Sequence, residues 1–203
     1  MLRFAHPGGA IISLCTSRSL WQDIVDQSQF WHIIESTKPF GEYTIEAHYD
    51  RLLEHVCGLT ETELLEFARI FHQQLERANT WEISDAAYVI NTGCGDDSFE
   101  DFKAGLVAQG EKVFEATLAC PEFLAQYPYA MQLIRAESIL YLPSTAYEMM
   151  EHRRQPGSNS QAIPEEIGPH GITEPSGSSV GEDPNALRNR FPKLFKTFWR
   201  LAE

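Results

Sequence analysis

The sequence has few basic residues for its length and lacks any long apolar run. Its 203 residues include 16 Lys and Arg against 29 Asp and Glu, which gives a net charge of −13. Nucleic-acid surfaces need clustered basic side chains that displace counterions, and anionic lipid surfaces attract basic segments. Direct nucleic-acid binding and membrane docking are therefore disfavoured. No stretch approaches the roughly 18 apolar residues of a transmembrane helix.

Cysteine is also scarce, and recognised catalytic motifs are absent. The cysteines are Cys15, Cys57, Cys94 and Cys120, and no two of them form a C-x-x-C pattern. No secretory signal is evident, so we expect reduced thiols in a cytoplasmic protein. The sequence contains no zinc-ligand spacing, P-loop, dinucleotide-binding glycine motif or nucleophile elbow. We therefore expect no metal and no cofactor, and we expect a binding protein rather than an enzyme.

What the sequence does contain is a repeated helical spacing of apolar residues. This spacing begins at Ser19 and predicts a helical domain over residues 19–153, whereas residues 1–18 show no period and are interpreted as an N-terminal extension. No segment alternates with the period of a β-strand. The fold class predicted is all-α, a single orthogonal bundle of many helices. Its expected helices include residues 42–55 and 129–141.

The C-terminal part of the chain differs in composition. Residues 155–186 contain five Pro and five Gly, which predicts an irregular loop over residues 154–187. Residues 188–203 then carry five basic side chains and one acidic side chain, whereas residues 1–187 carry 11 basic and 28 acidic ones. The aromatic and leucine side chains of this last segment predict a helix that packs back on the domain, with its basic residues over acidic surface.

Two helix starts are suggested by capping-box spacing. Thr60 precedes Glu63 by three residues, which places a hydroxyl at the N-cap and a carboxylate at the third helical position. Asp97 and Glu100 show the same spacing after the glycine-rich break at residues 93–95. Both pairs predict a helix that begins immediately after the first residue of the pair.

One candidate site is an acidic face on the helix expected at residues 42–55. Carboxylates recur every four residues at Glu42, Glu46, Asp50 and Glu54, and like charges at this spacing repel one another. The face is either simply solvated or a surface that meets a basic partner, which is the C-terminal helix or another protein. His48 and His55 are expected to lie at the edge of this face.

A second candidate site is the turn that contains Cys94, Asp96, Asp97, Glu100 and Asp101. Four carboxylates and a thiol here precede or begin a helix. Paired carboxylates can hold a hard cation. The pKa values of two close carboxylates can also differ, so that one acts as an acid and the other as a base. A thiol at a helix start can become a nucleophile. Alternatively, the aspartates only cap the helix and favour its positive end. The spacing is not that of an EF-hand.

Several motifs in order resemble a bacterial family of unknown function, family 4240 (DUF4240). The motifs are Phe30-Trp31-His32-Ile33-Ile34-Glu35, Trp81 through Ala87, Gly93-Cys94-Gly95-Asp96-Asp97-Ser98-Phe99-Glu100-Asp101-Phe102, Leu106-Val107-Ala108-Gln109-Gly110 and Ala116 to Leu124 with Pro121, followed late in the chain by Arg190-Phe191-Pro192-Lys193-Leu194. The resemblance implies a helical fold over about residues 30–150 and assigns no activity. Lys103-Ala104-Gly105 departs from the family pattern, where an Arg-Trp-like pair is usual.

These observations leave two hypotheses for function. The first is a non-enzymatic acidic protein-interaction module, with an immunity or antitoxin-like protein that covers a basic enzyme as a narrower form. The second is a carboxylate-dependent metal-binding protein or hydrolase centred on residues 93–101. The sequence does not define the oligomeric state.

Overall fold

The computed structural model describes residues 25–154, 162–168 and 171–199, and this part of the chain is all-α, as predicted. Its only β-type pairing is an isolated bridge between Thr80 and Ser176. The elements are α1 (Gln27–Ser36), α2 (Ile45–Val56), α3 (Glu61–Ala78), α4 (Trp81–Asn91), α5 (Asp96–Ala108), α6 (Glu111–Ala119), the 3-10 helices η1 (Pro121–Gln126) and η2 (Ala130–Arg135), α7 (Glu137–Leu140), α8 (Leu142–Arg154), α9 (Pro184–Arg190) and α10 (Pro192–Phe198).

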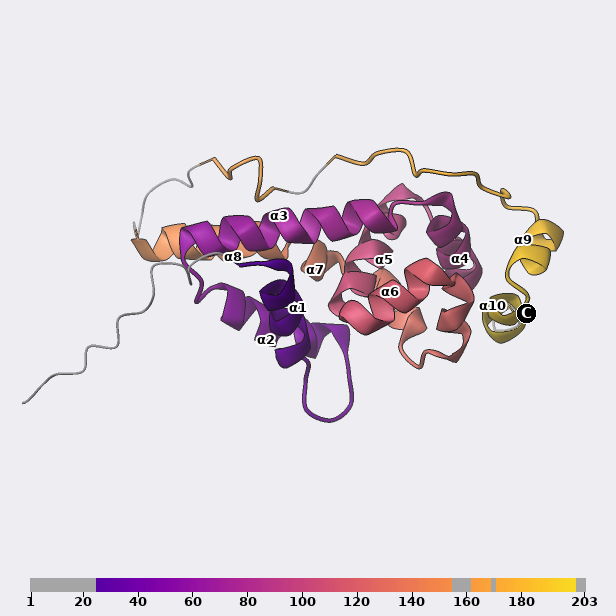
Figure 1. Cartoon of the computed structure of the whole chain (residues 1–203), viewed down its shortest axis with the longest axis horizontal. Coiled ribbons are helices and arrows are strands. Elements are labelled where there is room, and N and C mark those ends of the chain that lie inside the picture. The colour runs from indigo at the N-terminus through magenta and orange to yellow at the C-terminus, as the bar shows by residue number, and fades with distance from the viewer. Residues whose placement is uncertain (1–24, 155–161, 169–170, 200–203) are drawn as a thin grey trace, which may run out of the picture.

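Helix α3 is the longest element and runs along one side of the body with α8 beside it (Figure 1). Its start confirms the first capping box, because Thr60 Oγ1 accepts from the Glu63 amide and Glu63 Oε2 accepts from the Thr60 amide at 2.7 Å. Helix α2 begins three residues later than expected, because Thr44 caps it by accepting from the Ala47 amide.

The prediction of one continuous helix over residues 129–141 is wrong. The segment is divided into η2 and α7, which meet at Ala136. Helix α5 packs directly on η2, and a Cβ atom at Gly105 would overlap the backbone of Leu133. The glycine that departs from the family pattern therefore permits a close backbone contact in this chain.

The core is rich in aromatic contacts between helices. Phe30 and Trp31 of α1 are both buried; the Phe30 ring lies 5.0 Å from that of Phe67 on α3, and the Trp31 ring lies 5.4 Å from that of Phe114 on α6. The first family motif is thus a packing element. Truncation of such a buried aromatic ring to alanine typically costs about 3–5 kcal/mol.

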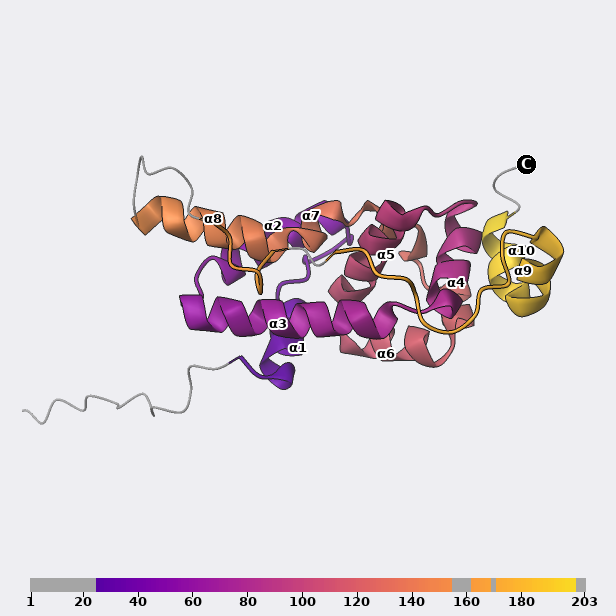
Figure 2. The same cartoon turned by 90° about the horizontal axis from the view of Figure 1, so that it is seen from above.

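After α8 the chain returns along the body to its far end. We call residues 171–183 the C-terminal strap, and it passes from the side of α3 toward α4 and α9 (Figure 2). The expected single helix at residues 188–203 is replaced, in the described part, by α9 and α10, which are separated at Phe191. Helix α10 packs on α4 and η1, and buries Leu194, Phe195 and Phe198.

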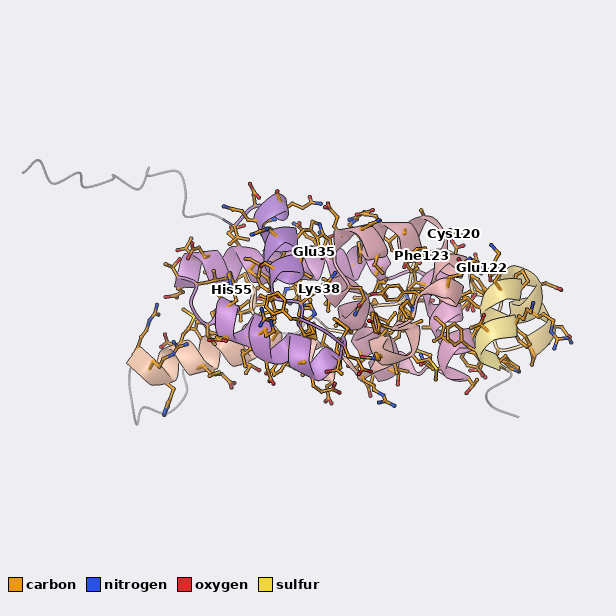
Figure 3. The ribbon with its side chains drawn as sticks, turned by 90° about the horizontal axis from the view of Figure 1, so that it is seen from below. Glu35, Lys38, His55, Cys120, Glu122 and Phe123 are labelled. Atoms are coloured by element: carbon orange, nitrogen blue, oxygen red, sulfur yellow. The ribbon has the colours of Figure 1, made fainter. Side chains whose placement is uncertain are left out.

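The basic residues of this C-terminal region are only partly paired. Arg190 forms an ion pair with Asp85 at 2.9 Å, and it is the only ion pair of the region among the described residues. The Arg188 guanidinium stacks on the Phe195 ring instead. Glu122 of η1, which lies next to α10 in Figure 3, accepts from the Lys193 and Leu194 amides and so caps that helix. Apolar burial, the capping of α10 and the ion pair of Arg190 with Asp85 together dock this region.

The extension expected at residues 1–18 and Arg200 lie outside the described residues. Within the described ranges, no helix combines the length and the apolar character needed to cross a bilayer.

Candidate functional site

The acidic face is the most exposed group of charges that the sequence singled out. Glu46, Asp50 and Glu54 lie on α2, whereas Glu42 precedes the helix in the loop of residues 37–44. All four side chains are exposed, and within the described part of the chain none forms an ion pair or a side-chain hydrogen bond. The structure thus presents these carboxylates together with their charge uncompensated.

Arg51, the one Lys or Arg side chain of α2, forms no ion pair with these carboxylates in the described structure. Its Nε donates to the Thr37 carbonyl at 2.9 Å, and its guanidinium lies 4.8 Å from the centre of the Phe40 ring. Phe40 is 92% exposed, which makes it the most exposed large apolar side chain of the described residues. The loop of residues 37–44 therefore combines an aromatic ring and the first carboxylate of the acidic face.

The sequence predicts His48 at the edge of the acidic face, and this prediction is wrong. The side chain is fully buried beneath that face. Burial lowers the pKa of the imidazole to about 4, so the ring is neutral at pH 7. Nε2 lies 3.1 Å from the Ile34 carbonyl, which can only accept, so Nε2 carries the proton. Nδ1 is then the acceptor for the Tyr43 hydroxyl at 3.3 Å. His55, in contrast, is exposed as expected.

This hydrogen-bond chain continues into the core. Gln109 Nε2 donates to the Tyr43 hydroxyl at 2.7 Å, and Gln109 Oε1 accepts from the Tyr127 hydroxyl at 2.6 Å. At the other end, the Thr37 hydroxyl lies 3.2 Å from His48 Nε2. Thr37 and Tyr43 stand near the two ends of the loop of residues 37–44. His48 therefore fixes both ends of the segment that presents Phe40 and Glu42.

A second contact fixes the start of the same loop. Lys38 Nζ bonds to Glu35 Oε2 and to the Gln109 carbonyl, each at 2.7 Å, and the Glu35–Lys38 pair lies beside α2 in Figure 3. Gly110 has a positive φ of 85°, and a Cβ atom there would overlap the Glu35 carboxylate. The Gln109-Gly110 motif is thus explained by the way it holds the end of α1.

The turn at residues 93–101 has a different geometry from the one expected. Helix α5 begins at Asp96 with Gly95 as its N-cap and without a side-chain cap, so the capping box predicted at Asp97 is wrong. Glycine in an extended conformation occupies the cap position, which moves Asp96 and Asp97 into the first turn. Both are exposed there and favour the positive end of the helix.

The thiol and the other two carboxylates of the turn lie in different environments. Burial, with Asp101 and Asp96 nearby, raises the pKa of Cys94 to about 11, so the thiol stays protonated at neutral pH. Burial, with Glu137, Asp97 and Glu100 nearby, raises the pKa of Asp101 to about 6. Glu100 is held by Lys103 Nζ at 2.7 Å. Across the described ranges, no cluster of three or more His, Cys, Asp or Glu side chains could hold a metal ion.

The sequence reasoning missed a group of polar residues at the C-terminal strap. Lys103 is buried, and its ammonium bonds to Glu100 and to Asn79 Oδ1 at 3.0 Å. Asn79 Nδ2 in turn donates to Thr173 Oγ1 at 2.8 Å. Lys103 lies three residues after Glu100 on the same helix, so local spacing could have revealed this ion pair. The contacts with Asn79 at the end of α3 and of Asn79 with the strap join distant segments, and local spacing does not reveal them.

Comparison with known proteins gives one match. A family model described as "Protein of unknown function (DUF4240)" matches residues 25–149, which cover the described chain from just before α1 into α8. No curated protein and no solved structure matches the chain.

Proposed function

Since the chain belongs to the DUF4240 family, whose function is unknown, we propose from its own geometry that it is a non-catalytic module that binds a basic protein partner. We define the acidic–aromatic face as Phe40, Glu42, Glu46, Asp50 and Glu54. The observation that carries the proposal is that four exposed carboxylates, without an ion pair in the described structure, line α2 and the loop before it, and that the same loop carries a ring that is 92% exposed.

The parts of this face suit two separate steps of association. Uncompensated carboxylates attract a basic surface over a distance and raise the rate of encounter, an effect that salt screens. An aromatic side chain that enters a pocket of the partner supplies apolar burial, which electrostatic pairs at a rim do not. The face contains both kinds of group within one helix and the loop before it.

The buried network beneath the face supports the same function. Ordering a loop on binding costs free energy, and a loop that is already fixed avoids that cost. His48 bonds to Tyr43 and approaches Thr37, and Lys38 ties the loop to the Gln109 carbonyl. The position of Phe40 is thereby set before a partner arrives. A narrower form of the proposal is an immunity or antitoxin-like protein that covers the basic active-site surface of an enzyme.

The test is capture of partners from native lysate by the full chain and by the double variant Glu46→Lys/Asp50→Lys. A specific basic partner should bind the wild-type chain at low salt, and the double variant should lose it. The matched control is Glu82→Lys/Glu174→Lys, which makes the same change in net charge at exposed positions outside the face. Equal loss in both variants, or no specific partner, would contradict the proposal.

Phe40→Ala separates the aromatic contribution from the charge. Because Phe40 is almost fully exposed, the variant should fold with unchanged stability. An aromatic residue at the centre of an interface is typically worth about 2 kcal/mol or more, which is roughly a thirtyfold loss of affinity. Retention of full affinity by Phe40→Ala would show that the ring lies outside the interface.

The second candidate, a carboxylate-dependent metal-binding protein or hydrolase at residues 93–101, has one observation in its favour. The pKa of Asp101 is about 6, within the range useful for a general acid. Calorimetric titration with Mg²⁺, Ca²⁺, Mn²⁺ and Zn²⁺ tests the metal form of this candidate. Binding heat that disappears in Asp101→Asn would support it, and no heat from any cation would remove it.

A further inference from the structure

A cavity of about 540 Å³ lies between α3, α5, α7 and the C-terminal strap, away from the acidic–aromatic face. Sites for small organic ligands have volumes of about 300–1,000 Å³ and are mostly apolar with a few polar groups. The apolar groups here are Leu75 of α3, Leu140 of α7 and Ile172 of the strap. Ile172 is 55% exposed, so this wall offers apolar surface to a ligand.

The strap wall of the cavity is held in place by Asn79. Its Nδ2 donates to Thr173 Oγ1 and to the Thr173 carbonyl, at 2.8 and 3.3 Å. Its own carbonyl accepts from the Ser176 amide at 3.0 Å. The segment that carries Ile172 is therefore bonded to the end of α3, and the cavity is formed without a ligand.

The positive charges of the cavity are already compensated. The Lys103 ammonium bonds to Glu100 at 2.7 Å and to Asn79, and it lies 4.8 Å from the centre of the Phe99 ring. Arg69, at the edge of the cavity, is paired with Glu66 at 2.7 Å. Neither cation is left to attract an anionic ligand on its own.

Two negative charges of the cavity are not compensated. Glu76 of α3 and Glu166, in the segment of residues 162–168, both line the cavity and are exposed. Within the described structure, neither carboxylate forms an ion pair or a side-chain hydrogen bond. Apolar walls with two such carboxylates suit a ligand that has an apolar body and a positive end.

We propose that this cavity binds a small organic cation, a primary amine with an aromatic or aliphatic body. The body would contact Leu75, Leu140 and Ile172, and the ammonium would lie at Glu76 or at Glu166. Removal of the apolar body from water supplies most of the affinity, and the carboxylates supply the preference for a cation over an anion.

The test compares two probes of the same shape and opposite charge, 2-phenylethylamine and 3-phenylpropanoate. Both are titrated into the full chain at about pH 8, where the amine is still charged. Binding is followed by calorimetry and by protein NMR shifts. We expect saturable binding of the amine and none of the carboxylate.

Variants then place the probe in the cavity. Glu76→Gln/Glu166→Gln should lower the affinity for the amine by about tenfold or more, and Ile172→Trp should block the cavity. Glu46→Gln/Asp50→Gln is the matched control for lost negative charge and should leave amine binding unchanged. The proposal is overturned by equal or tighter binding of the carboxylate, by undiminished amine binding to the Glu76/Glu166 variant, or by no amine binding up to about 10 mM.

Discussion

Asn79 Oδ1 accepts a hydrogen bond from the buried Lys103 ammonium at 3.0 Å, while Nδ2 of the same amide donates to Thr173 on the C-terminal strap. One side chain thus stabilises a buried charge and fixes a segment 94 residues away. Its carbonyl and amide groups are used at the same time, and neither an acid nor an aliphatic residue offers both. The end of α3 and the strap are therefore expected to respond together to a change at this position.

Asn79→Ala should destabilise the chain by about 2–4 kcal/mol, because Lys103 loses one of its two hydrogen bonds while it stays buried. The free energy of unfolding from urea titration measures this loss. Limited proteolysis should also cleave the strap faster. Thr173→Ala is the control, since it removes only one bond to the strap and should cost about 1 kcal/mol. Equal costs in the two variants would show that the contact with Lys103 contributes nothing.

His48 makes the stability of the fold dependent on pH. Burial lowers its pKa in the folded chain to about 4, against 6.5 for an ordinary imidazole. Between these values the unfolded chain binds the proton and the folded chain does not. Stability is therefore complete above about pH 6.5 and is lost as the pH falls toward 4, by about 1–3 kcal/mol.

Urea unfolding between about pH 7.5 and 4.5 measures this effect. His48→Gln should lose stability at neutral pH, where its hydrogen bonds to Tyr43 and the Ile34 carbonyl are disturbed, and should show a smaller decline toward acid pH. His55→Gln on the same helix is the control, because that side chain is exposed. If His48→Gln retains the full decline of the wild-type chain, the buried imidazole is not its source.

The elements that could be read from the sequence are those whose signals are local. The Thr60–Glu63 capping box was predicted because both bonds join residues three positions apart. The turn before α5 was misjudged, since Gly95 takes the cap position in an extended conformation that the aspartate spacing does not indicate. The sequence also predicts one helix through Ala136, whereas η2 ends and α7 begins there. The close contact of Gly105 with Leu133 joins two elements that only the fold brings together.

The buried polar residues were beyond local reasoning for the same reason. His48 was assigned to the surface from its helical position, yet its ring forms part of a chain that reaches Gln109, which is 66 residues from Tyr43. The helical period does place His48 on the buried face of α2, three residues after Ile45 and four before Leu52, but it does not reveal the partner of the imidazole. In contrast, the exposed carboxylates of α2 were correctly placed, because solvent exposure of charged residues follows from the helical period.

Asp85 is expected to control the docking of the C-terminal region. Its carboxylate accepts from the Ser179 hydroxyl at 2.6 Å, the Val180 amide at 2.9 Å and Arg190 at 2.9 Å, and the residue is buried on α4. Asp85→Ala leaves three donors without their acceptor and should cost about 3–5 kcal/mol. Hydrogen exchange should increase across the strap, α9 and α10.

The control for Asp85→Ala is Glu174→Ala, which removes an exposed carboxylate from the strap. It should leave both the unfolding free energy and the exchange pattern close to those of the wild-type chain. Uniform exchange throughout the Asp85→Ala variant would contradict a local anchoring role, because loss of one anchor should first release the segment that it holds.

Asp101 should show the opposite pH dependence to His48. Its pKa rises from 3.8 to about 6 on folding, so the folded chain binds the proton more tightly than the unfolded chain between these values. The neutral carboxyl is favoured, and this stability is lost as the pH rises through 6. Asp101→Asn keeps the neutral form at every pH. The variant should therefore melt at a higher temperature than the wild-type chain at about pH 7.5 and at a similar temperature at about pH 4.

Asp50→Asn removes one negative charge from an exposed position on α2. It is the control for the effect of reducing the size of the net charge of −13 by one. If it raises the melting temperature as much as Asp101→Asn, the effect comes from net charge and not from the surroundings of Asp101. The same pair of variants bears on the second candidate function, because residues kept at a cost in stability are typical of active sites. If Asp101→Asn is more stable than the wild-type chain but no longer gives the heat of metal binding that the wild-type chain shows, Asp101 is kept for a metal site in the turn at residues 93–101. A stabilised variant with unchanged behaviour in every other assay would leave the acidic–aromatic face as the better-supported site.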